Sequence, residues 1–315
     1  MAKFLVTGGA GFIGSHIVER LVRDGAEVVV LDDLSSGNEE NLTEVLNKIT
    51  FIKGDVRDLD LLRKITEDVD YILHEAAMAS VPASIDDPLK CHEVNVTGTI
   101  NVLLSAKENG VKRVVYAASS AVYGNNETLP KKEDMYPEPL SPYAVSKYAG
   151  ELYLQVFARI YGIEAVGLRY FNVYGPKQDP KSQYAAVIPK FIDALLKGMP
   201  PTIYGDGLQT RDFIFIDDVV EANMLALTAR GASGKVFNIA CGERISLNRL
   251  YKVIKEIIGV DIEPVYAEAR VGDVRDSLAD ISLARNILGF EPKVSLEEGL
   301  KKTVEWHRRK LEVGK

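Results

Sequence analysis

The sequence predicts an α/β protein whose centre is a doubly wound parallel sheet, with a smaller C-terminal lobe attached. Three observations predict this fold class. Strand-like and helix-like patterns alternate through the first half of the chain, a glycine-rich turn joins the first strand to the first helix, and prolines punctuate shorter elements after Asn172. Alternating strands and helices are typical of right-handed βαβ units, which build parallel sheets.

The first strand and the turn after it hold the strongest signal. A β-rich run at Phe4–Thr7 enters a turn in which Gly8, Gly11 and Gly14 stand three residues apart, and Phe12–Arg23 continues at helical spacing. Glycines lack Cβ, so they permit a tight turn and the close approach of a pyrophosphate, to which the helix start offers unpaired N–H groups. This pattern predicts a Rossmann-type dinucleotide site, although glycine triplets also occur in ordinary surface turns.

The second strand supports the same interpretation. Glu27–Leu31 is rich in valine and ends at Asp32, about 20 residues after the glycines, where a carboxylate accepts both hydroxyls of a ribose. A carboxylate there repels a 2′-phosphate, and the sequence places no arginine beside it to receive one. We therefore predict that the cofactor is NAD rather than NADP. A solvated aspartate after a surface turn is the alternative.

The remaining strands indicate where the chemistry lies. The predicted strands are Thr50–Lys53, Tyr71–His74, Arg113–Ala117 and Glu164–Leu168, and Phe213–Ile216 and Val236–Ile239 are expected to return to the sheet. We expect residues 1–173 with about 211–240 to form the dinucleotide-binding domain, and about 174–210 with 241–315 to form the lobe. Ligands in such sheets bind beyond the carboxyl ends of the strands, so functional residues should directly follow the strands.

Two loops after these strands offer weaker candidates. Asp55, after the third strand, is placed to meet an adenine, and His74–Ala77 puts small residues where a dinucleotide would pass. Ordinary loop chemistry explains either segment equally well.

Ser119, after the fifth strand, and the pair Tyr143 and Lys147 carry the catalytic prediction. Ser141 with Pro142 fits the cap and first position of a helix on which Tyr143 and Lys147, four residues apart, share a face. A free phenol has a pKa near 10, but a fixed ammonium and an oxidised nicotinamide nearby favour the phenolate. Tyr143 would then take a proton from a substrate hydroxyl while hydride leaves the same carbon, and Ser119 would share or relay that proton. The alternative is a helix surface with an incidental tyrosine and lysine.

Composition argues against several classes of protein. The 315 residues carry a formal net charge of -7, which argues against a nucleic-acid binder. No run of about 18 apolar residues occurs, and the N-terminus enters a core strand without room for a cleavable signal. Cys91 and Cys241 are too few for a disulfide framework, and the four histidines lack metal-ligand spacing. We expect a reduced cytoplasmic protein without a metal, nucleic-acid or membrane partner.

With these motifs, the chain resembles an extended short-chain dehydrogenase/reductase that acts on nucleotide sugars. The likeness covers essentially the whole chain and includes Leu168–Gly175, Tyr184–Pro189, Gly205–Gly207, Thr210–Phe213 and Arg270–Asp273. Together these segments resemble the UDP-hexose 4-epimerases. Gln178–Pro180 and Ala185–Pro189 resemble the branch that handles UDP-N-acetylglucosamine and UDP-N-acetylgalactosamine.

The resemblance implies an NAD that stays bound and a reaction at C4 of the sugar. Tyr143 would take the proton from the 4-hydroxyl, hydride would move from C4 to NAD, and after the 4-keto sugar turns round hydride would return to its other face. The cofactor contacts predicted in this way are Gly8, Gly11, Phe12, Ile13, Gly14, Asp32, Asp33, Ser35, Gly37, Asn38, Asp55, Val56, Ala76, Asn95, Tyr143, Lys147 and Tyr170.

The same resemblance implies how a UDP-sugar is held. Arginine suits the diphosphate because its planar guanidinium donates two hydrogen bonds to phosphate oxygens. The implied contacts are Asn172 to the diphosphate–sugar region, Tyr204 to the uracil, Arg211 and Arg270 to the diphosphate, Asp273 to the uridine ribose, and Ser80, Ser119, Tyr143, Ala186, Val187 and Ser277 around the sugar.

Two departures from related enzymes narrow the prediction. Dehydrating members of the superfamily carry an acidic pair directly after the fifth-strand serine, where this chain has Ser120–Ala121. Ser277 falls where glucose-restricted epimerases carry a tyrosine, and a small residue leaves space for a 2-acetamido group; a solvated loop serine is the alternative. We therefore predict an epimerase of UDP-N-acetylglucosamine and UDP-N-acetylgalactosamine that also accepts UDP-glucose and UDP-galactose.

Other functions stay open on the same scaffold. They are UDP-glucose 4-epimerase as the main activity, a nucleotide-sugar decarboxylase, dehydratase or reductase, and a non-catalytic NAD-sensing protein. Retention of Ser119, Tyr143 and Lys147 argues against a sensor, which needs no proton-transfer group. The resemblance also suggests a homodimer through helices near Asn95–Asn109 and Pro142–Tyr161, although burial within one subunit explains their apolar positions as well.

Overall fold

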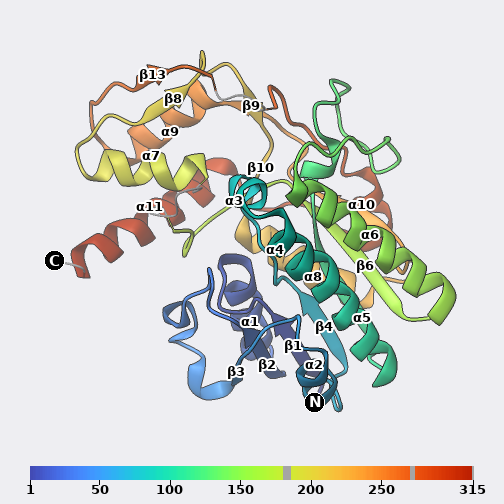
Figure 1. Ribbon diagram of the computed structural model, residues 1–315. Coiled ribbons are helices and arrows are strands. Elements are labelled where there is room, and N and C mark those ends of the chain that lie inside the picture. The colour runs from blue at the N-terminus through green and yellow to red at the C-terminus, as the bar shows by residue number, and fades with distance from the viewer. Residues whose placement is uncertain (180–185, 270–273, 314–315) are drawn as a thin grey trace.

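The computed structural model describes residues 1–179, 186–269 and 274–313, and Figure 1 shows their arrangement. At its centre lies a parallel seven-stranded sheet in the order β11-β6-β5-β4-β1-β2-β3, which confirms the predicted doubly wound class. The order reverses between β1 and β4, where such sheets bind dinucleotides. The strands are β1 (Lys3–Thr7), β2 (Glu27–Asp32), β3 (Thr50–Lys53), β4 (Tyr71–His74), β5 (Arg113–Ser119), β6 (Glu164–Tyr170) and β11 (Val236–Ile239).

Alternate side chains of each strand enter different cores. In β1, Phe4 and Val6 pack on one face of the sheet and Leu5 packs on the other. The side chains of Val28–Leu31 in β2 alternate in the same way. Successive side chains of a strand point to opposite faces, so a strand that is apolar throughout needs cover on both.

Helices cover both faces of the sheet. On one face, α1 (Phe12–Arg23) packs against α8 (Ile216–Thr228). On the other lie α2 (Leu59–Ile65), α5 (Gly98–Glu108) and α6 (Pro142–Tyr161). α10 (Ser282–Leu288) lies against β11. Short helical segments connect the larger elements: η1 (Glu39–Leu42), η2 (Leu46–Lys48), α3 (Val81–Asp86), α4 (Pro88–His92), the π-helical η3 (Glu93–Thr97) and η4 (Ser120–Tyr123).

Helix α6 begins where the sequence predicts. The Ser141 hydroxyl accepts a hydrogen bond from the Ala144 N–H at 3.2 Å, and Pro142 occupies the first helical position. Serine satisfies an N–H that the helix leaves unpaired, and proline has no N–H to leave unpaired. The helix ends at Gly162, whose φ of 70° is left-handed.

The other elements form the part of the molecule at the top of Figure 1. α7 (Val187–Leu196), α9 (Leu247–Ile258) and α11 (Leu296–Val313) pack against one another beside two paired strands, β8 (Thr202–Tyr204) and β13 (Val265–Ala267). Two further strands, β9 (Thr210–Arg211) and β12 (Ile245–Ser246), pair antiparallel.

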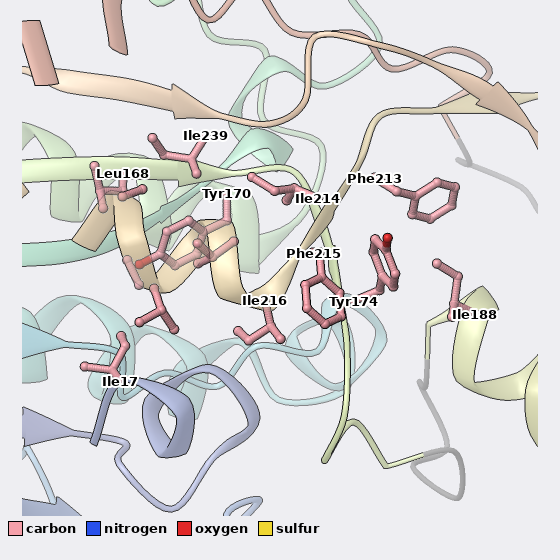
Figure 2. Close-up of a cluster of buried hydrophobic side chains, with 14 of the residues drawn as sticks. Ile17, Leu168, Tyr170, Tyr174, Ile188, Phe213, Ile214, Phe215, Ile216 and Ile239 are labelled. Carbon is pink, nitrogen blue, oxygen red and sulfur yellow. The ribbon is translucent and has the colours of Figure 1, made fainter. Parts of the chain in front are cut away.

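One hydrophobic cluster joins this part to the sheet. Figure 2 shows it as a run of side chains from Ile17 and Leu168 through Phe215 and Tyr174 to Ile188. The cluster crosses from α1 and β6 to α7 without interruption. The division of the chain into two domains stays a prediction.

The structure corrects one predicted strand. Phe213–Ile216 does not return to the main sheet; instead β10 (Phe213–Phe215) pairs in parallel with β7 (Asn172–Tyr174), and α8 begins at Ile216. The place beside β6 is taken by β11, which confirms the prediction for Val236–Ile239. Apolar composition alone does not distinguish a main-sheet strand from a short buried pair.

Candidate active site

The glycine turn leaves no room for side chains. Gly8 has a φ of 68°, and a Cβ there would lie 2.6 Å from the Ala76 nitrogen. A Cβ on Gly14 would lie 2.2 Å from the Gly8 oxygen. No side chain caps α1 at Gly11, so the helix start presents its N–H groups to a ligand. A cradle of packed backbone at a helix N-terminus fits the pyrophosphate of a dinucleotide.

Asp32 is fixed at the end of β2. Its carboxylate accepts hydrogen bonds from the Ala10 N–H at 2.9 Å and the Leu34 N–H at 2.8 Å, and burial raises its pKa. A Cβ on Gly37 would lie 2.8 Å from this carboxylate, so the loop after β2 folds tightly over it. The arrangement orients an acceptor toward the glycine turn, as a ribose diol requires.

The predicted cofactor contacts around Asp32 belong to the same loop. The Asn38 N–H donates to the Ala10 carbonyl at 3.0 Å, and its side chain caps η1. Asp33 accepts from the Ser35 N–H at 2.9 Å. The structure therefore gathers these residues beside the glycine turn.

Other predicted cofactor residues have structural partners. Asp55 pairs with Arg57 at 2.7 Å, and the Arg57 side chain lowers its pKa. Val56 is buried, and the Ala76 N–H donates to the Thr7 hydroxyl at 3.3 Å. Asn95 accepts from the Met78 N–H at 2.7 Å and donates to the Ser146 hydroxyl at 2.9 Å. Asn95 therefore joins the loop after β4 to helix α6.

The three catalytic candidates meet where β5 ends against α6. Ser119 and Tyr143 line the same cavity, where the Ser119 hydroxyl acts to lower the pKa of the Tyr143 phenol, and the Lys147 ammonium donates to the Ala117 carbonyl at 2.7 Å. Lys147 is only 3% exposed. α6 is further fixed by a buried pair in which Arg169 of β6 contacts Glu151 at 2.7 Å. Backbone and ion-pair contacts thus hold the helix in one position on the sheet.

The expected drop in the Tyr143 pKa is not present in the protein alone. Burial raises the pKa of Tyr143, and the Ser119 hydrogen bond opposes this rise. Burial also lowers the pKa of Lys147 to about 8, with the Glu75 carboxylate opposing. Two reasons explain the difference. The Lys147 ammonium donates to a backbone carbonyl rather than to the phenol, and the positive charge of the oxidised nicotinamide, which the expectation also included, is present only when the cofactor is bound.

Glu75 is a residue that sequence reasoning missed. Its carboxylate accepts a hydrogen bond from the Tyr170 hydroxyl at 2.9 Å, and the Asn223 amide donates to that hydroxyl at 2.8 Å. Burial raises the pKa of Glu75 to about 7, against the influence of Lys147. The available signal was a carboxylate placed between His74 and two alanines at the end of a buried strand.

One cavity of about 510 Å³ unites the catalytic and the substrate candidates. Residues from the sheet edge and from the C-terminal elements share its wall. The predicted residues that line it are Phe12, Ile13, Ser119, Tyr143, Tyr170, Asn172, Ala186, Val187, Tyr204 and Arg211. Gln178, Lys190 and Gln209 also line it and were not predicted.

Two described substrate candidates, Ser80 and Ser277, lie outside this cavity wall. Ser80 caps α3 by accepting from the Ala83 N–H at 3.1 Å, and the Ser277 N–H donates to the Thr210 carbonyl at 3.1 Å. Neither belongs to the cavity wall as formed by the described part of the chain. Arg270 and Asp273 fall outside the described residues.

Two other kinds of site were expected to be absent. Across residues 1–179, 186–269 and 274–313, no helix is long and apolar enough to cross a bilayer. Within the same ranges, no three histidine, cysteine, aspartate or glutamate side chains gather as a metal ion would require.

Known proteins resemble this chain along its whole length. Residues 4–240 match the family described as the NAD dependent epimerase/dehydratase family. A UDP-glucose 4-epimerase of Mycolicibacterium smegmatis is 44% identical, over 98% of this chain and 99% of its own.

Two solved structures are similar in both sequence and fold. A UDP-N-acetylglucosamine 4-epimerase from Methanobrevibacter ruminantium M1, in complex with UDP-N-acetylmuramic acid, is 45% identical with a TM-score of 0.95, over 98% of this chain and 99% of that chain. A UDP-glucose 4-epimerase from Thermotoga maritima, with UDP-glucose, is 43% identical with a TM-score of 0.94, over the same shares.

Proposed function

Since this chain belongs to the NAD dependent epimerase/dehydratase family, we propose that it is an NAD-dependent 4-epimerase of UDP-sugars. One observation carries the proposal. Ser119 and Tyr143, the proposed proton-transfer residues, line the same cavity as the proposed nucleotide-sugar contacts Asn172, Tyr204 and Arg211. A single bound nucleotide sugar would therefore reach both groups of residues.

The glycine turn and Asp32 would hold the cofactor, and the residues of α6 would handle the proton. NAD, when bound, supplies a hydride acceptor that later returns the hydride. Tyr143 takes the proton from the sugar hydroxyl and gives it back, and Ser119 shares its hydrogen bond during both transfers. Lys147 supplies a buried positive charge that favours the phenolate once the cofactor is present.

The opposite wall of the cavity would hold the nucleotide. Arg211 supplies a guanidinium for the diphosphate, and Tyr204 supplies an aromatic face for the uracil. The Asn172 amide, which donates to the Asp212 carbonyl at 2.9 Å, would contact the region between diphosphate and sugar.

We propose UDP-N-acetylglucosamine and UDP-N-acetylgalactosamine as the preferred pair, with UDP-glucose and UDP-galactose also accepted. The small side chain at Ser277 and the likeness to the Methanobrevibacter enzyme support this preference. The likeness to the Mycolicibacterium and Thermotoga enzymes supports the plain hexoses as the alternative main substrates. Dehydration is disfavoured because Ser120 and Ala121, at the start of η4, place no carboxyl after Ser119.

The deciding experiment is incubation with each of the UDP-hexoses and their N-acetylated forms, followed by chromatographic separation of the C4 epimers. We expect conversion without net consumption of nicotinamide cofactor and with a transient rise in the absorbance of the reduced form. Net cofactor consumption would instead indicate a reductase. Loss of carbon dioxide from a uronic acid substrate would indicate a decarboxylase.

We also propose that the protein is a homodimer through α5 and α6. The exposed large hydrophobic side chains of α6 are Val145, Leu152, Tyr153, Val156, Ile160 and Tyr161. The spacing of Val145, Leu152, Val156 and Ile160 places these four in one stripe along the helix. Exposed apolar stripes of this kind are typical of interfaces. Light scattering should show a dimer that Val156→Glu dissociates, whereas a monomeric wild type would contradict the proposal.

A further inference from the structure

We propose that Asp212 is a positioning residue for the nucleotide-sugar wall of the cavity. Its buried carboxylate ties the segment that carries Arg211 to two other stretches of chain, and its backbone carbonyl accepts from the Asn172 amide. The identity of the substrate rests on the function proposed above, but the contacts that fix these segments do not.

Asp212 lies between β9 and β10 and is 0% exposed. One carboxylate oxygen accepts from the Cys241 N–H at 2.9 Å. The other accepts from the Gly242 N–H and the Ala279 N–H, each at 3.1 Å. An ionised carboxylate has two acceptor oxygens and can accept several hydrogen bonds at once. Three separate stretches of chain therefore meet at this side chain.

Two of these stretches, that of Asp212 itself and that of Ala279, lead to residues of the proposed site. The backbone carbonyl of Asp212 accepts from the Asn172 amide at 2.9 Å. Arg211 is its neighbour, and the Arg211 guanidinium donates to the Arg275 carbonyl at 3.1 Å. The stretch with Ala279 also holds Ser277, whose N–H donates to Thr210. A shift at Asp212 would therefore move Asn172 and Arg211 together.

The carboxylate is held in an unfavourable environment. Burial raises its pKa to about 6, although its three backbone hydrogen bonds favour the charged form, and the nearby Glu243 carboxylate raises the pKa further. Burying a charge is costly, and each backbone N–H would lose free energy if its acceptor were removed. The contacts that retain this group join the segment that carries Arg211 to residues 241–242 and to Ala279.

The catalytic group is fixed independently of Asp212. Lys147 is anchored to the Ala117 carbonyl, and the Tyr143 N–H donates to the Ser84 hydroxyl at 3.1 Å. A change at Asp212 should therefore weaken substrate binding and leave the chemical step nearly intact. A residue that serves stability alone would not separate KM from kcat in this way.

Asp218 provides a matched control. It is also a buried aspartate, 3% exposed, and it accepts from the backbone N–H groups of Lys293 at 2.9 Å and Val294 at 3.1 Å. Burial raises its pKa as well. The residues on either side of Asp212, Arg211 and Phe213, line the cavity, whereas neither the chain neighbours nor the partners of Asp218 belong to its wall as formed by the described residues. Asp218→Asn therefore makes the same chemical change away from the site.

The experiment compares Asp212→Asn with Asp218→Asn. In Asp212→Asn the amide N–H₂ replaces one acceptor oxygen and faces backbone N–H donors, with which it cannot form hydrogen bonds. The stretch of chain that carries these donors must therefore separate from residue 212. We expect KM for the UDP-sugar and Kd for UDP, the latter measured by calorimetry, to rise about 10- to 100-fold, as loss of a charge-assisted hydrogen bond implies. The kcat should stay within about threefold and bound NAD should be retained. Asp218→Asn should lower Tm while leaving KM and Kd unchanged.

Three results would overturn the assignment. They are an unchanged KM in Asp212→Asn, equal KM shifts in both variants, and a loss confined to kcat. If Asp212→Asn does not fold, Asp212→Ser retains a short acceptor and takes its place. Failure of both to fold would assign Asp212 to the fold rather than to the site. A wild type that binds UDP but converts no UDP-sugar would contradict the proposed function, while the UDP titrations would still test Asp212.

Discussion

The two sides of the proposed site are built in different ways. The proposed cofactor side, here called the cofactor wall, comes from neighbouring strand ends of one parallel sheet, at the glycine turn after β1, Asp32 after β2, Glu75 after β4 and Ser119 after β5. Phe12, Ile13 and Ser119 of this side line the cavity, whereas Asp32 and Glu75 lie outside its lining. The nucleotide-sugar wall comes from short segments outside that sheet, which hydrogen bonds to Asp212 hold together. The first wall inherits its geometry from the sheet, whereas the second depends on a few individual side chains.

This difference predicts how each wall responds to mutation. Parallel strands end on one edge, so a side chain there is placed by the whole sheet and its loss removes only its own chemistry. A side chain that ties segments together affects several binding groups when it changes. We therefore expect changes in the cofactor wall to act on the chemical step or on cofactor content, and changes in the other wall to act on substrate affinity.

The largest effect is expected from Tyr143→Phe. The ring keeps its place on α6, but the proton acceptor is gone, and general acid–base groups contribute about 10²–10⁴ in rate. Steady-state kinetics should show kcat reduced by at least that much, with NAD still bound and KM nearly constant. Turnover at the wild-type rate would remove Tyr143 from the mechanism.

Gly14→Ala should act on cofactor content rather than on substrate affinity. The new Cβ would meet the Gly8 oxygen at 2.2 Å, so the turn must open. Overpacking of this kind costs roughly 1–3 kcal/mol, or about 5- to 150-fold in binding. Mass spectrometry of cofactor released by denaturation should show less NAD in Gly14→Ala than in the wild type. Equal NAD content in the two proteins, or recovery of NADP alone, would contradict this account.

The same difference explains what could be predicted from the sequence. Tyr143 and Lys147 are four residues apart on one helix, and the glycines stand within one turn, so local spacing suffices to recognise them. The donors to Asp212 lie 29, 30 and 67 residues away, and Glu75 meets Tyr170 across 95 residues. No periodicity encodes such pairs. The wrong prediction that Phe213–Ile216 joins the main sheet has the same origin, because the sequence does not show that this segment pairs with β7.

Ser277→Tyr tests whether the nucleotide-sugar wall sets the sugar preference. A bulky side chain beside C2 should reject a 2-acetamido group by steric overlap, at roughly 1–3 kcal/mol or about 5- to 150-fold in kcat/KM. UDP-glucose should be affected far less, and Ser277→Ala should behave like the wild type with both sugars. Ser277 lies outside the described cavity wall. Equal losses of kcat/KM for the two sugars would show that Ser277 does not determine the sugar preference.

The smallest effect is expected from the charge on Glu75, which acts on the cofactor wall through Lys147. Lys147 has its pKa lowered to about 8 by burial, so its ammonium is lost as the pH rises through that value, where an exposed lysine would stay charged. The Glu75 carboxylate opposes this shift. Removing its charge in Glu75→Gln should therefore move the alkaline decline of kcat to lower pH, while the amide retains an acceptor for the Tyr170 hydroxyl. The measurement is kcat against pH, with KM followed in parallel. If Glu75→Gln changed the pH dependence of KM and left that of kcat unaltered, Glu75 would act on substrate binding. The distinction between the two walls would then not hold at this residue.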